Sequence, residues 1–469
     1  MIQMRSRFLA AGFALALATQ PCGVAGDVGI LIEHIELGAA EATALLHGGR
    51  PARDATALRT AVGKLIDAGE AEQIDLVYAT GGSGQQIKVG SLHEFIYPTE
   101  WDPAEIPSEI EAPVTAEMDL KVPANPTVFE DRELGNTVEA KALVAGDGTV
   151  RLTLSSETAG LLSRSGVGNE ELGIEVPQFS ARRISGEFTC REGRPLLAGM
   201  FTPRKPGKRD RRVMVFATVS TRQVPWPDDV EQEPELLEDP FADRPDDEGE
   251  KPPAEPEEVE FGVQCGVEYV EIPQAAVGQL LAVIPADFET SSTPREIIDR
   301  LVERGEAKVL ASAHLTNSGY RARVQPVHEF IYPSEYDAPS VVQKLTPEIL
   351  EEGGALVTRS SPTAFVVRNL GLSVETESKV SGEGEMITVE LDSDRVRHVR
   401  SSTWGVEEAE AEVPVFETIR CSTEMRLRPG EEAIAAILTP RDDQEGRASR
   451  DRCVVILLWA DVAKAELQR

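Results

Sequence analysis

Apolar and polar residues alternate with a period of two along most of this chain, which is the pattern of a half-buried β-strand. The glycines of Glu192-Gly193 and Pro429-Gly430 suit tight turns with positive φ between such strands. The expected strands are Ile30–Leu37, Val138–Ala142, Thr149–Leu154, Ser180–Cys190, Pro195–Phe201, Arg212–Val219, Val267–Ile272 and Cys453–Trp459. The pattern predicts an α+β chain that is mainly β and antiparallel.

Apolar residues with helical spacing occur once in each half of the chain. In the second half, Thr293 can cap a helix, Pro294 fits its first turn and Gly305 ends it. Between them the apolar stripe is formed by Ile297, Ile298, Leu301 and Val302. In the first half, the residues in matching places before Gly69 are Val62, Leu65 and Ile66. A hairpin is expected after each helix, with turns at Gly81–Gly84 and Asn317–Gly319.

The two halves match each other in order and at a nearly constant offset. The matched segments are Ile32–Leu37 with Val267–Ile272, Gly69–Glu72 with Gly305–Lys308, His93–Trp101 with His328–Tyr336, Pro126–Phe129 with Pro362–Phe365, Val176–Phe179 with Val413–Phe416, and Phe201–Pro203 with Leu438–Pro440. A unit of roughly 200 residues is too long for a solenoid repeat. The sequence therefore predicts a tandem duplication, with each copy a strand–helix–hairpin half followed by antiparallel strands.

The segment between the copies differs from both in composition. Residues 226–260 are mostly Asp, Glu and Pro, and Arg244 and Lys251 are the basic ones. Such a segment buries too little apolar surface to offset its ordering entropy, and its charge and prolines keep it extended. We predict repeat 1 over residues 27–222, an acidic, Pro-rich linker over 223–261 and repeat 2 over 262–469.

Overall charge excludes several classes of protein. The 469 residues include 80 acidic and 47 basic ones, a formal net charge of −33. Nucleic-acid binding needs clustered Lys and Arg, and docking on anionic lipid through charge needs the same. No apolar run approaches the roughly 20 residues of a membrane-spanning helix.

The first 25 residues have the order of a secretory signal. Arg5 and Arg7 precede an apolar stretch, Phe8–Ala18, and Gly23-x-Ala25 is a plausible cleavage motif. A lipid anchor at Cys22 is the alternative, but the residues before it are not the small apolar ones expected of a lipoprotein. We interpret residues 1–25 as a cleaved signal, which predicts an exported protein.

Four cysteines remain after such cleavage: Cys190, Cys265, Cys421 and Cys453. Their number is too small for a disulfide scaffold, and their spacing fits no zinc pattern. Strand parity places Cys190 with Ile184 and Phe188, and Cys421 with Thr423 and Met425, on inward faces. We interpret these thiols as small buried hydrophobic groups, with a bridge as the alternative.

The order of several short motifs resembles a known family. In the family, a Gly-x-Ala-x-Val-Leu-Ser segment and an Asn-Gly turn follow the helix, and Gly-Thr-x-Leu-x-Val, Pro-x-Phe-x-Thr-Arg and a late Gly turn come later. The matching segments are Gly305–Ser312, Asn317–Gly319, Gly135–Glu139, Gly371–Glu375, Pro177–Arg182, Pro414–Arg420, Gly193–Met200 and Gly430–Leu438. Each copy thus resembles the secretin homology domain of bacterial type II and type III secretion systems, over nearly its whole length.

The departures from the family bear on function. The family's last hairpin has Gly-Gly where this chain has Ala198-Gly199 and Ala435-Ala436, and no small ring-building modules precede the domain. A lipid-facing strand needs about 9–11 residues with one apolar face. In repeat 1, Ser155–Glu157 end the apolar face that Val150 and Leu154 begin. In repeat 2, Asp394 and Arg395 place a charge on each face of the strand. The resemblance therefore implies a soluble, diverged secretin-like protein, with a multimeric export pore as the alternative.

Catalytic motifs were sought at the sextet His-Glu-Phe-Ile-Tyr-Pro, which begins at His93 and again at His328. The adjacent His and Glu of a strand point to opposite faces, so they do not form a metal site together. Gly81–Gly84 lacks the Gly-Lys-Ser/Thr ending of a phosphate loop, and no nucleophile elbow or His-Glu-x-x-His motif occurs. We assign no catalytic, cofactor-binding or metal-binding residues.

The sequence thus predicts an exported, non-catalytic envelope protein, periplasmic or associated with the outer membrane. We expect it to act by β-mediated self-association or by binding other envelope proteins in a secretion or envelope assembly, and to use no cofactor. Membrane association stays open. A multimeric outer-membrane secretin pore is the alternative, and a periplasmic enzyme is a weaker one.

Overall fold

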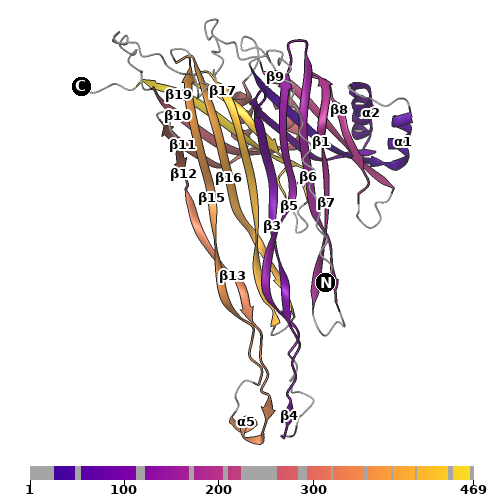
Figure 1. Cartoon of the computed structure of the whole chain (residues 1–469), viewed down its shortest axis with the longest axis vertical. Coiled ribbons are helices and arrows are strands. Elements are labelled where there is room, and N and C mark those ends of the chain that lie inside the picture. Colours follow the sequence, from indigo (N-terminus) through magenta and orange to yellow (C-terminus); the bar gives the residue numbers. More distant parts are fainter. Residues whose placement is uncertain are drawn as a thin grey trace, which may run out of the picture.

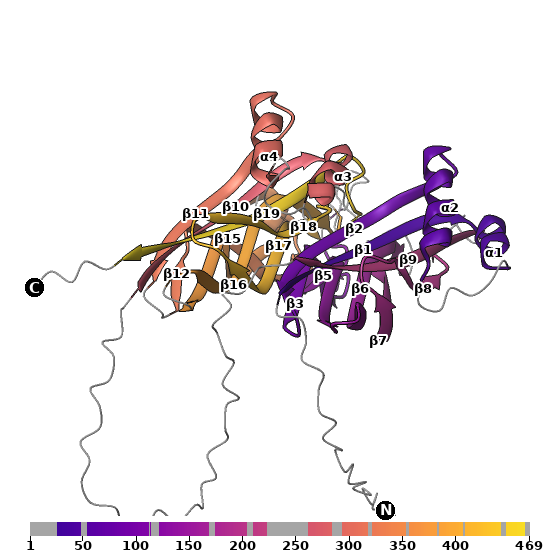
Figure 2. The same cartoon turned by 90° about the horizontal axis from the view of Figure 1, so that it is seen from above.

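The computed structural model describes residues 26–47, 54–111, 113, 122–167, 174–203, 210–222, 261–283, 293–317, 321–352, 356–381, 384–406, 409–441 and 447–464. The predicted signal lies outside these residues, as does the predicted linker except for its last residue. Two large antiparallel sheets carry the described chain, and the helices lie on one of them (Figures 1 and 2). The fold is α+β and mainly β, as the alternation predicts.

The first sheet has eight strands in the order β11-β10-β19-β18-β2-β1-β9-β8. Its strands are β1 (Asp27–Gly38), β2 (Ala71–Gly82), β8 (Leu196–Phe201), β9 (Arg211–Arg222), β10 (Phe261–Pro273), β11 (Lys308–Asn317), β18 (Glu431–Leu438) and β19 (Arg452–Lys464). The first half of the chain, β1 to β9, supplies one block of four strands. The second half, β10 to β19, supplies the other.

The second sheet is built in the same two blocks from longer strands. Its order is β12-β15-β16-β17-β3-β5-β6-β7, and β13 pairs with both β15 and β5. Its strands are β3 (Gln86–Asp102), β5 (Asn125–Val144), β6 (Thr149–Gly166), β7 (Glu175–Arg191), β12 (Ala322–Val324), β13 (Val327–Asp337), β15 (Ser361–Ser381), β16 (Met386–Trp404) and β17 (Ala411–Leu427).

The two sheets pack face to face over one continuous apolar core. The inward face of β6, with Val150, Leu152 and Leu154, is fully buried there. Cys190, Cys265 and Cys421 lie in the same core, and Cys453 lies in the core on the other side of the eight-stranded sheet. All four are free thiols, which confirms their prediction as buried hydrophobic groups.

Helices cover the other face of the eight-stranded sheet (Figure 2). They are α1 (Ala39–His47) and α2 (Thr56–Asp67) on the first half, and α3 (Gln274–Val283) and α4 (Pro294–Glu303) on the second. The predicted start of α4 is confirmed: the Thr293 side chain accepts a hydrogen bond from the Glu296 backbone N–H. On this face of the sheet each half therefore has two helices, where the sequence predicted one.

The long strands continue beyond the eight-stranded sheet as a narrow stalk (Figure 1). At its tip β4 (Glu109–Ile110) pairs in parallel with β14 (Lys344–Leu345), next to α5 (Pro347–Glu352). A separate core of mostly aromatic side chains fills the stalk, among them Phe95, Phe129, Trp404 and Phe416. Both halves contribute to it.

Both predicted hairpins are wrong. Gly81–Gly84 does form a turn, but β2 before it belongs to the eight-stranded sheet and β3 after it to the nine-stranded sheet, so the two strands do not pair. In the second half, β11 before the predicted turn at Asn317–Gly319 and β12 after it likewise belong to different sheets. At these places the chain moves between layers instead. The strand that was expected to end at Ser155–Glu157 also continues. β6 runs to Gly166, and Ser155–Glu157 pair with residues of β7.

The ladders of the two halves share their irregularities. His93 lies opposite Leu134 as His328 lies opposite Leu370, and both ladders are then interrupted beyond Pro98 and Pro333. Positive-φ glycines recur in the same places, at Gly69 and Gly305, Gly135 and Gly371, Gly148 and Gly384, and Gly193 and Gly430. The last pair includes both glycines that the sequence assigned to tight turns.

Candidate assembly edges

The two halves of the chain meet edge to edge in both sheets. In the nine-stranded sheet β17 pairs with β3, from Val415 opposite Phe95 to Ser422 opposite Lys88. In the eight-stranded sheet β18 pairs with β2, from Ala436 opposite Ala79 to Leu438 opposite Val77. We call this double junction the inner seam. Backbone hydrogen bonds thus continue each sheet from one half into the other.

A buried ion pair crosses the inner seam. The guanidinium of Arg441 donates to Asp75 Oδ2 at 2.7 Å, and both side chains are at most 5% exposed. Arg441 Nε also donates to the Ser91 carbonyl at 3.0 Å, and His93 Nε2 lies 3.0 Å from the Arg441 carbonyl. Burial lowers the pKa of His93. Because buried charges need compensating partners, this cluster makes the contact between the halves selective.

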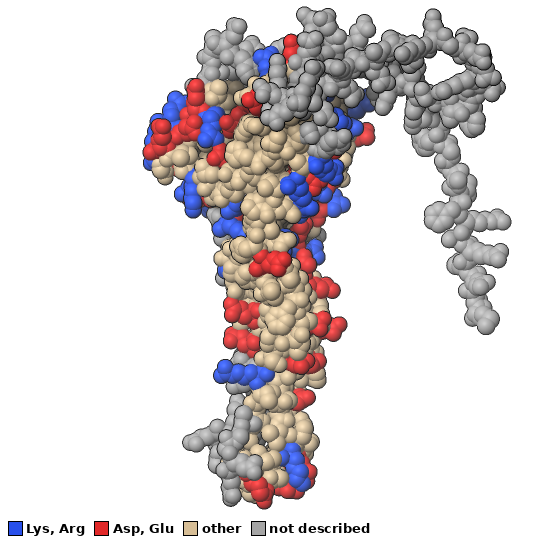
Figure 3. Space-filling view, turned by 90° about the vertical axis from the view of Figure 1, so that its left-hand side faces the viewer, with Lys and Arg blue, Asp and Glu red and all other residues tan. Residues whose placement is uncertain are grey.

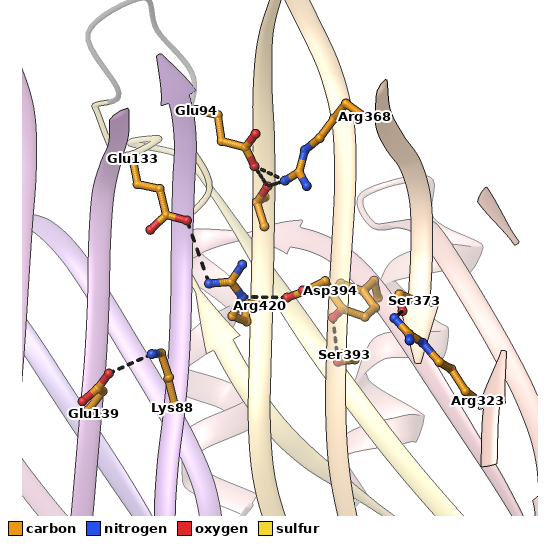
Figure 4. A network of polar contacts seen from close by, with 12 residues as sticks. Lys88, Glu94, Glu133, Glu139, Arg323, Arg368, Ser373, Ser393, Asp394 and Arg420 are labelled. Atoms are coloured by element: carbon orange, nitrogen blue, oxygen red, sulfur yellow. Dashed lines mark hydrogen bonds and ion pairs between the residues drawn. The ribbon is translucent and has the colours of Figure 1, made fainter. Parts of the chain in front are cut away.

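A second ion pair crosses the inner seam in the nine-stranded sheet. Arg368 on β15 donates to Glu94 on β3, and Thr418 on β17 donates to the same carboxylate at 2.9 Å (Figure 4). Burial raises the pKa of Glu94, while its basic and hydroxyl partners oppose that shift. A charge on the first half is thereby held by two residues of the second half.

Further charges form a row across the long strands. Arg420 on β17 donates to Asp394 at 2.9 Å and lies 3.9 Å from Glu133 of the first half (Figure 4). Lys88 and Glu139 form a neighbouring pair at 2.9 Å. A cavity of about 370 Å³ lies beside this row, lined by Leu92, Arg132, Glu133, Gly135, Thr137, Glu139, Ser155, Glu157, Ala159 and Arg183.

Aromatic contacts also join the two halves in the stalk, including a contact outside the inner seam. Tyr336 of β13 packs edge-on against Phe129 of β5, with ring centroids 5.7 Å apart. Trp404 donates its indole N–H to the Ile96 carbonyl at 3.2 Å. The side chains of Ile96, Phe129 and Trp404 are all buried as a result.

The strands at the outer ends of the two sheets correspond to the strands that meet in the inner seam. In the described part of the chain, β7 and β8 end the sheets on the side of the first half, and we call them the first edge. The sheets end on the other side with β11, β12 and the part of β13 before Glu335, which we call the second edge. Glu335 itself pairs with Val128 of β5, so the end of β13 joins the two halves in the stalk. Such edges present backbone groups that can pair with another chain.

Large apolar side chains are exposed close to both edges. Beside the first edge they are Val167, Val176 and Met200; beside the second they are Val309, Ile331, Phe365, Val366 and Val367. Figure 3 faces the second edge and shows an uncharged strip that runs down the stalk between acidic side chains. Large exposed apolar side chains beside unpaired strands make these edges candidate interaction sites.

The sextet singled out in the sequence lies on these edges. His93 and Glu94 contact different partners within the inner seam, while His328 and Glu329 are exposed on the second edge. The seam residues Asp75, Arg441 and Arg368 were not predicted. The sequence did contain a signal for two of them. Asp75 and Arg441 are charged residues within or beside an apolar strand, where a charge is rarely buried unless it is paired.

The described residues contain neither a cluster suited to a metal ion nor a helix suited to cross a membrane. No group of three or more His, Cys, Asp or Glu residues there is placed to hold a metal ion. Among the same residues, no helix is both long and apolar enough to cross a membrane.

Three solved structures are similar to this chain. The first is the type II secretion system secretin GspD of E. coli K12, with 9% identity over 44% of this chain and 49% of that one, and a TM-score of 0.20. The second is the type IV competence pilus secretin PilQ of V. cholerae, with 12% identity over 56% of this chain and 69% of that one, and a TM-score of 0.23. The third is the InvG secretin domain β-barrel of the Salmonella SPI-1 injectisome, with 9% identity over 67% of this chain and 89% of that one, and a TM-score of 0.22. The chain thus spans about half the length of GspD. No protein-family model and no curated protein matches the sequence.

Proposed function

We propose that this protein is an exported, non-catalytic component of a bacterial envelope or secretion assembly, and that it acts by joining β-sheet edges. It consists of two copies of a secretin-like unit, repeat 1 (residues 27–222) and repeat 2 (residues 262–469). Its working surfaces are the first and second edges.

The observation that carries this proposal is the inner seam. One half presents β17 and β18, the other presents β3 and β2, and the two edges join both sheets at once. The outer edges are made of the corresponding strands of the opposite halves. A molecule that closes one such junction and leaves both of its complementary sides open is built to add further units.

The duplication is supported by the ladders and turns of the two halves. The β8–β9 ladder skips a residue between Leu197 and Gly199, and the β18–β19 ladder skips one between Ile434 and Ala436. Equal bulges and equal positive-φ glycines in the same order are what one unit copied once would give.

Export and envelope location rest on the sequence. The basic, apolar and small-residue order of residues 1–25 supports secretion. The motif order of both copies supports the likeness to the secretin homology domain. A non-catalytic role is supported by the paired state of the charges that line the cavity, where Arg183 bonds Glu157 and Lys88 bonds Glu139.

Native mass spectrometry of the mature, tag-purified chain tests the proposal. The expected result is a periplasmic extract in which the chain is bound to itself or to another envelope protein without detergent. A large, heat-resistant multimer that leaves the membrane only with detergent would instead support an export pore. A chain that remains a monomer and captures no envelope protein would refute the proposal.

A further inference from the structure

We infer that buried polar residues at the inner seam form an acid-sensitive latch, in which protonation of His34 and His93 loosens the contact between the two halves of the chain. This inference goes beyond the proposed function and is independent of it, because every group involved belongs to one chain. Histidine is the side chain whose ordinary charge change falls between about pH 5 and pH 8, so such a latch responds to mild acid.

A layer of polar side chains separates the two apolar cores of the molecule. β3 runs from Val89 in the core between the sheets, through Ser91 and His93, to Phe95 in the core of the stalk. Polar residues occupy the same place between the two cores on β5 and β6. We call the buried set at this level the polar layer: His34, Asp75, Ser91, His93, Asn136, Ser156, Glu417 and Arg441.

Direct contacts run through the polar layer from one half of the chain to the other. Asp75 lies opposite His34 in the β1–β2 ladder, and His34 Nε2 lies 3.4 Å from Ser156 Oγ. Arg441 of the second half donates to Asp75, and its own carbonyl oxygen lies 3.0 Å from His93 Nε2. Both histidines therefore lie beside the charges that join the halves.

His34 lies where an added proton is poorly compensated. It faces Asp75 from β2, Ser156 from β6 and, across the inner seam, Arg441. Burial lowers the pKa of His34 most strongly, the Asp75 carboxylate opposes that shift, and Arg441 adds to it. Asp75 is already bonded to Arg441, and Nδ1 of His34 has no hydrogen-bond partner within the described part of the chain. A charged His34 therefore destabilises the closed seam.

His93 is in a similar position on the other side of Arg441. Burial lowers its pKa most strongly, Glu417 opposes that shift, and Arg441 and Arg400 add to it. Because Nε2 donates to the Arg441 carbonyl, an added proton goes to Nδ1, which has no partner among the described residues. Glu417 lies opposite His93 but already compensates two cations of β16, Arg395 and Arg397.

Repeat 2 does not carry the same titrating pair. At the facing positions of β10 and β11 that correspond to His34 and Asp75 it has Tyr269 and Ala311. The Tyr269 hydroxyl lies 2.8 Å from Ser393 Oγ, and burial raises its pKa, so it stays neutral in acid. His328, at the place of His93, is exposed. Mild acid is therefore expected to act on the inner seam and to leave β10 and β11 unchanged.

The ladder beside the polar layer is short. β2 and β18 pair only from Ala79 opposite Ala436 to Val77 opposite Leu438. Asp75 and Arg441 follow just beyond the last of these pairs. A buried histidine gains its proton when the surrounding structure opens to water, and a short ladder opens most easily. We expect opening to begin between β2 and β18.

Hydrogen exchange of the full chain at about pH 7.5 and about pH 5 tests the latch, with each rate divided by the intrinsic rate at that pH. Protection of β2 and β18 is expected to fall by about tenfold or more. The reason is that each histidine that must gain a proton favours opening by about tenfold per pH unit below its ordinary pKa of 6.5. Protection of β10 and β11 is expected to stay within a few-fold, which makes them the internal control.

Histidine variants assign the effect. His34→Gln/His93→Gln keeps an amide N–H for the Arg441 carbonyl and is expected to abolish the fall in protection, and each single variant is expected to reduce it. His328→Gln is the matched control, because its side chain is exposed, and it is expected to keep the full response. Glu94→Gln removes another titrating group of the inner seam, whose pKa burial raises, and is also expected to keep the response.

The outcomes decide the inference without reference to the proposed function. A fall confined to the inner seam and abolished in the double variant supports the latch. An equal fall in β10 and β11, or no fall at pH 5, would overturn it, as would a response that survives in the double variant or disappears in Glu94→Gln. If the double variant does not fold, the two single variants decide, because a latch requires a smaller fall in each of them.

Discussion

Replacing Arg441 with Met is expected to open the inner seam. The substitution keeps much of the apolar stem and removes the guanidinium, so Asp75 loses its 2.7 Å partner inside the protein. The Ser91 carbonyl also loses the bond from Arg441 Nε. Because Asp75 is about as deeply buried as Arg441, water does not take over the lost contacts.

The size of the effect follows from that burial. Removing one member of a buried pair destabilises by about 3–5 kcal/mol, because the remaining charge is left without compensation. At 1.4 kcal/mol per factor of ten, this corresponds to an increase in local opening of roughly 100- to 4,000-fold. Replacing both partners, as Asp75→Ala/Arg441→Met, is expected to recover most of the loss. The second half already has alanine, Ala311, at the place of Asp75.

Hydrogen exchange followed by mass spectrometry measures this opening at the seam itself. Amides of β2 and β18 are expected to exchange faster in Arg441→Met, while those of β1 and β9 change less. Arg183→Met is the matched control, because its ion pair with Glu157 is largely exposed and contributes under about 1 kcal/mol. Exchange in Arg441→Met within a few-fold of the parent, or a double variant as labile as the single one, would refute this account of the seam.

Three other predictions concern pH, backbone and thiols. Burial lowers the pKa of His34 and of His93 below the ordinary 6.5, so as the pH falls these side chains are protonated in the unfolded chain before the folded one. Thermal stability is therefore expected to stay level above pH 6.5 and to fall below it. His93→Gln should make that fall less steep. Gly135→Ala is expected to lower Tm by several degrees, because a Cβ there would lie 2.1 Å from the Ser91 carbonyl oxygen and the backbone φ is +139°. Gly146→Ala is the control: its Cβ meets no atom within 4 Å, so Tm should not change. Burial raises the pKa of Cys421 and of Cys453 to about 12, so a thiol reagent at pH 8 is expected to label neither until denaturant is added, and fast labelling of the native chain would contradict this.

Local patterns predicted the strands and one helix type well. Alternation identified strands that have one face on the core, such as β1, β6 and β9, and the Thr293-Pro294 start identified α4. The helices α1 and α3 were missed, because segments such as Gln274–Val283 are apolar around most of their circumference and show no stripe. The pairing of β2 and β3 was mispredicted, since a glycine-rich turn allows a hairpin and a change of layer equally.

The seam could not be predicted from local patterns. Asp75 and Arg441 are far apart in sequence, and their proximity depends on how the two halves register against each other. The repeated sextet did mark strands at the junction. His93 of the first copy is buried and His328 of the second is exposed, and β17 pairs along β3 but not along β13.

Since the inner seam joins parts of one polypeptide, its formation is unimolecular and independent of protein concentration. Dilution therefore leaves the two halves joined, whereas it weakens any contact with a separate chain. Because one polypeptide holds both halves, a seam that opens locally closes again without having to find a new partner.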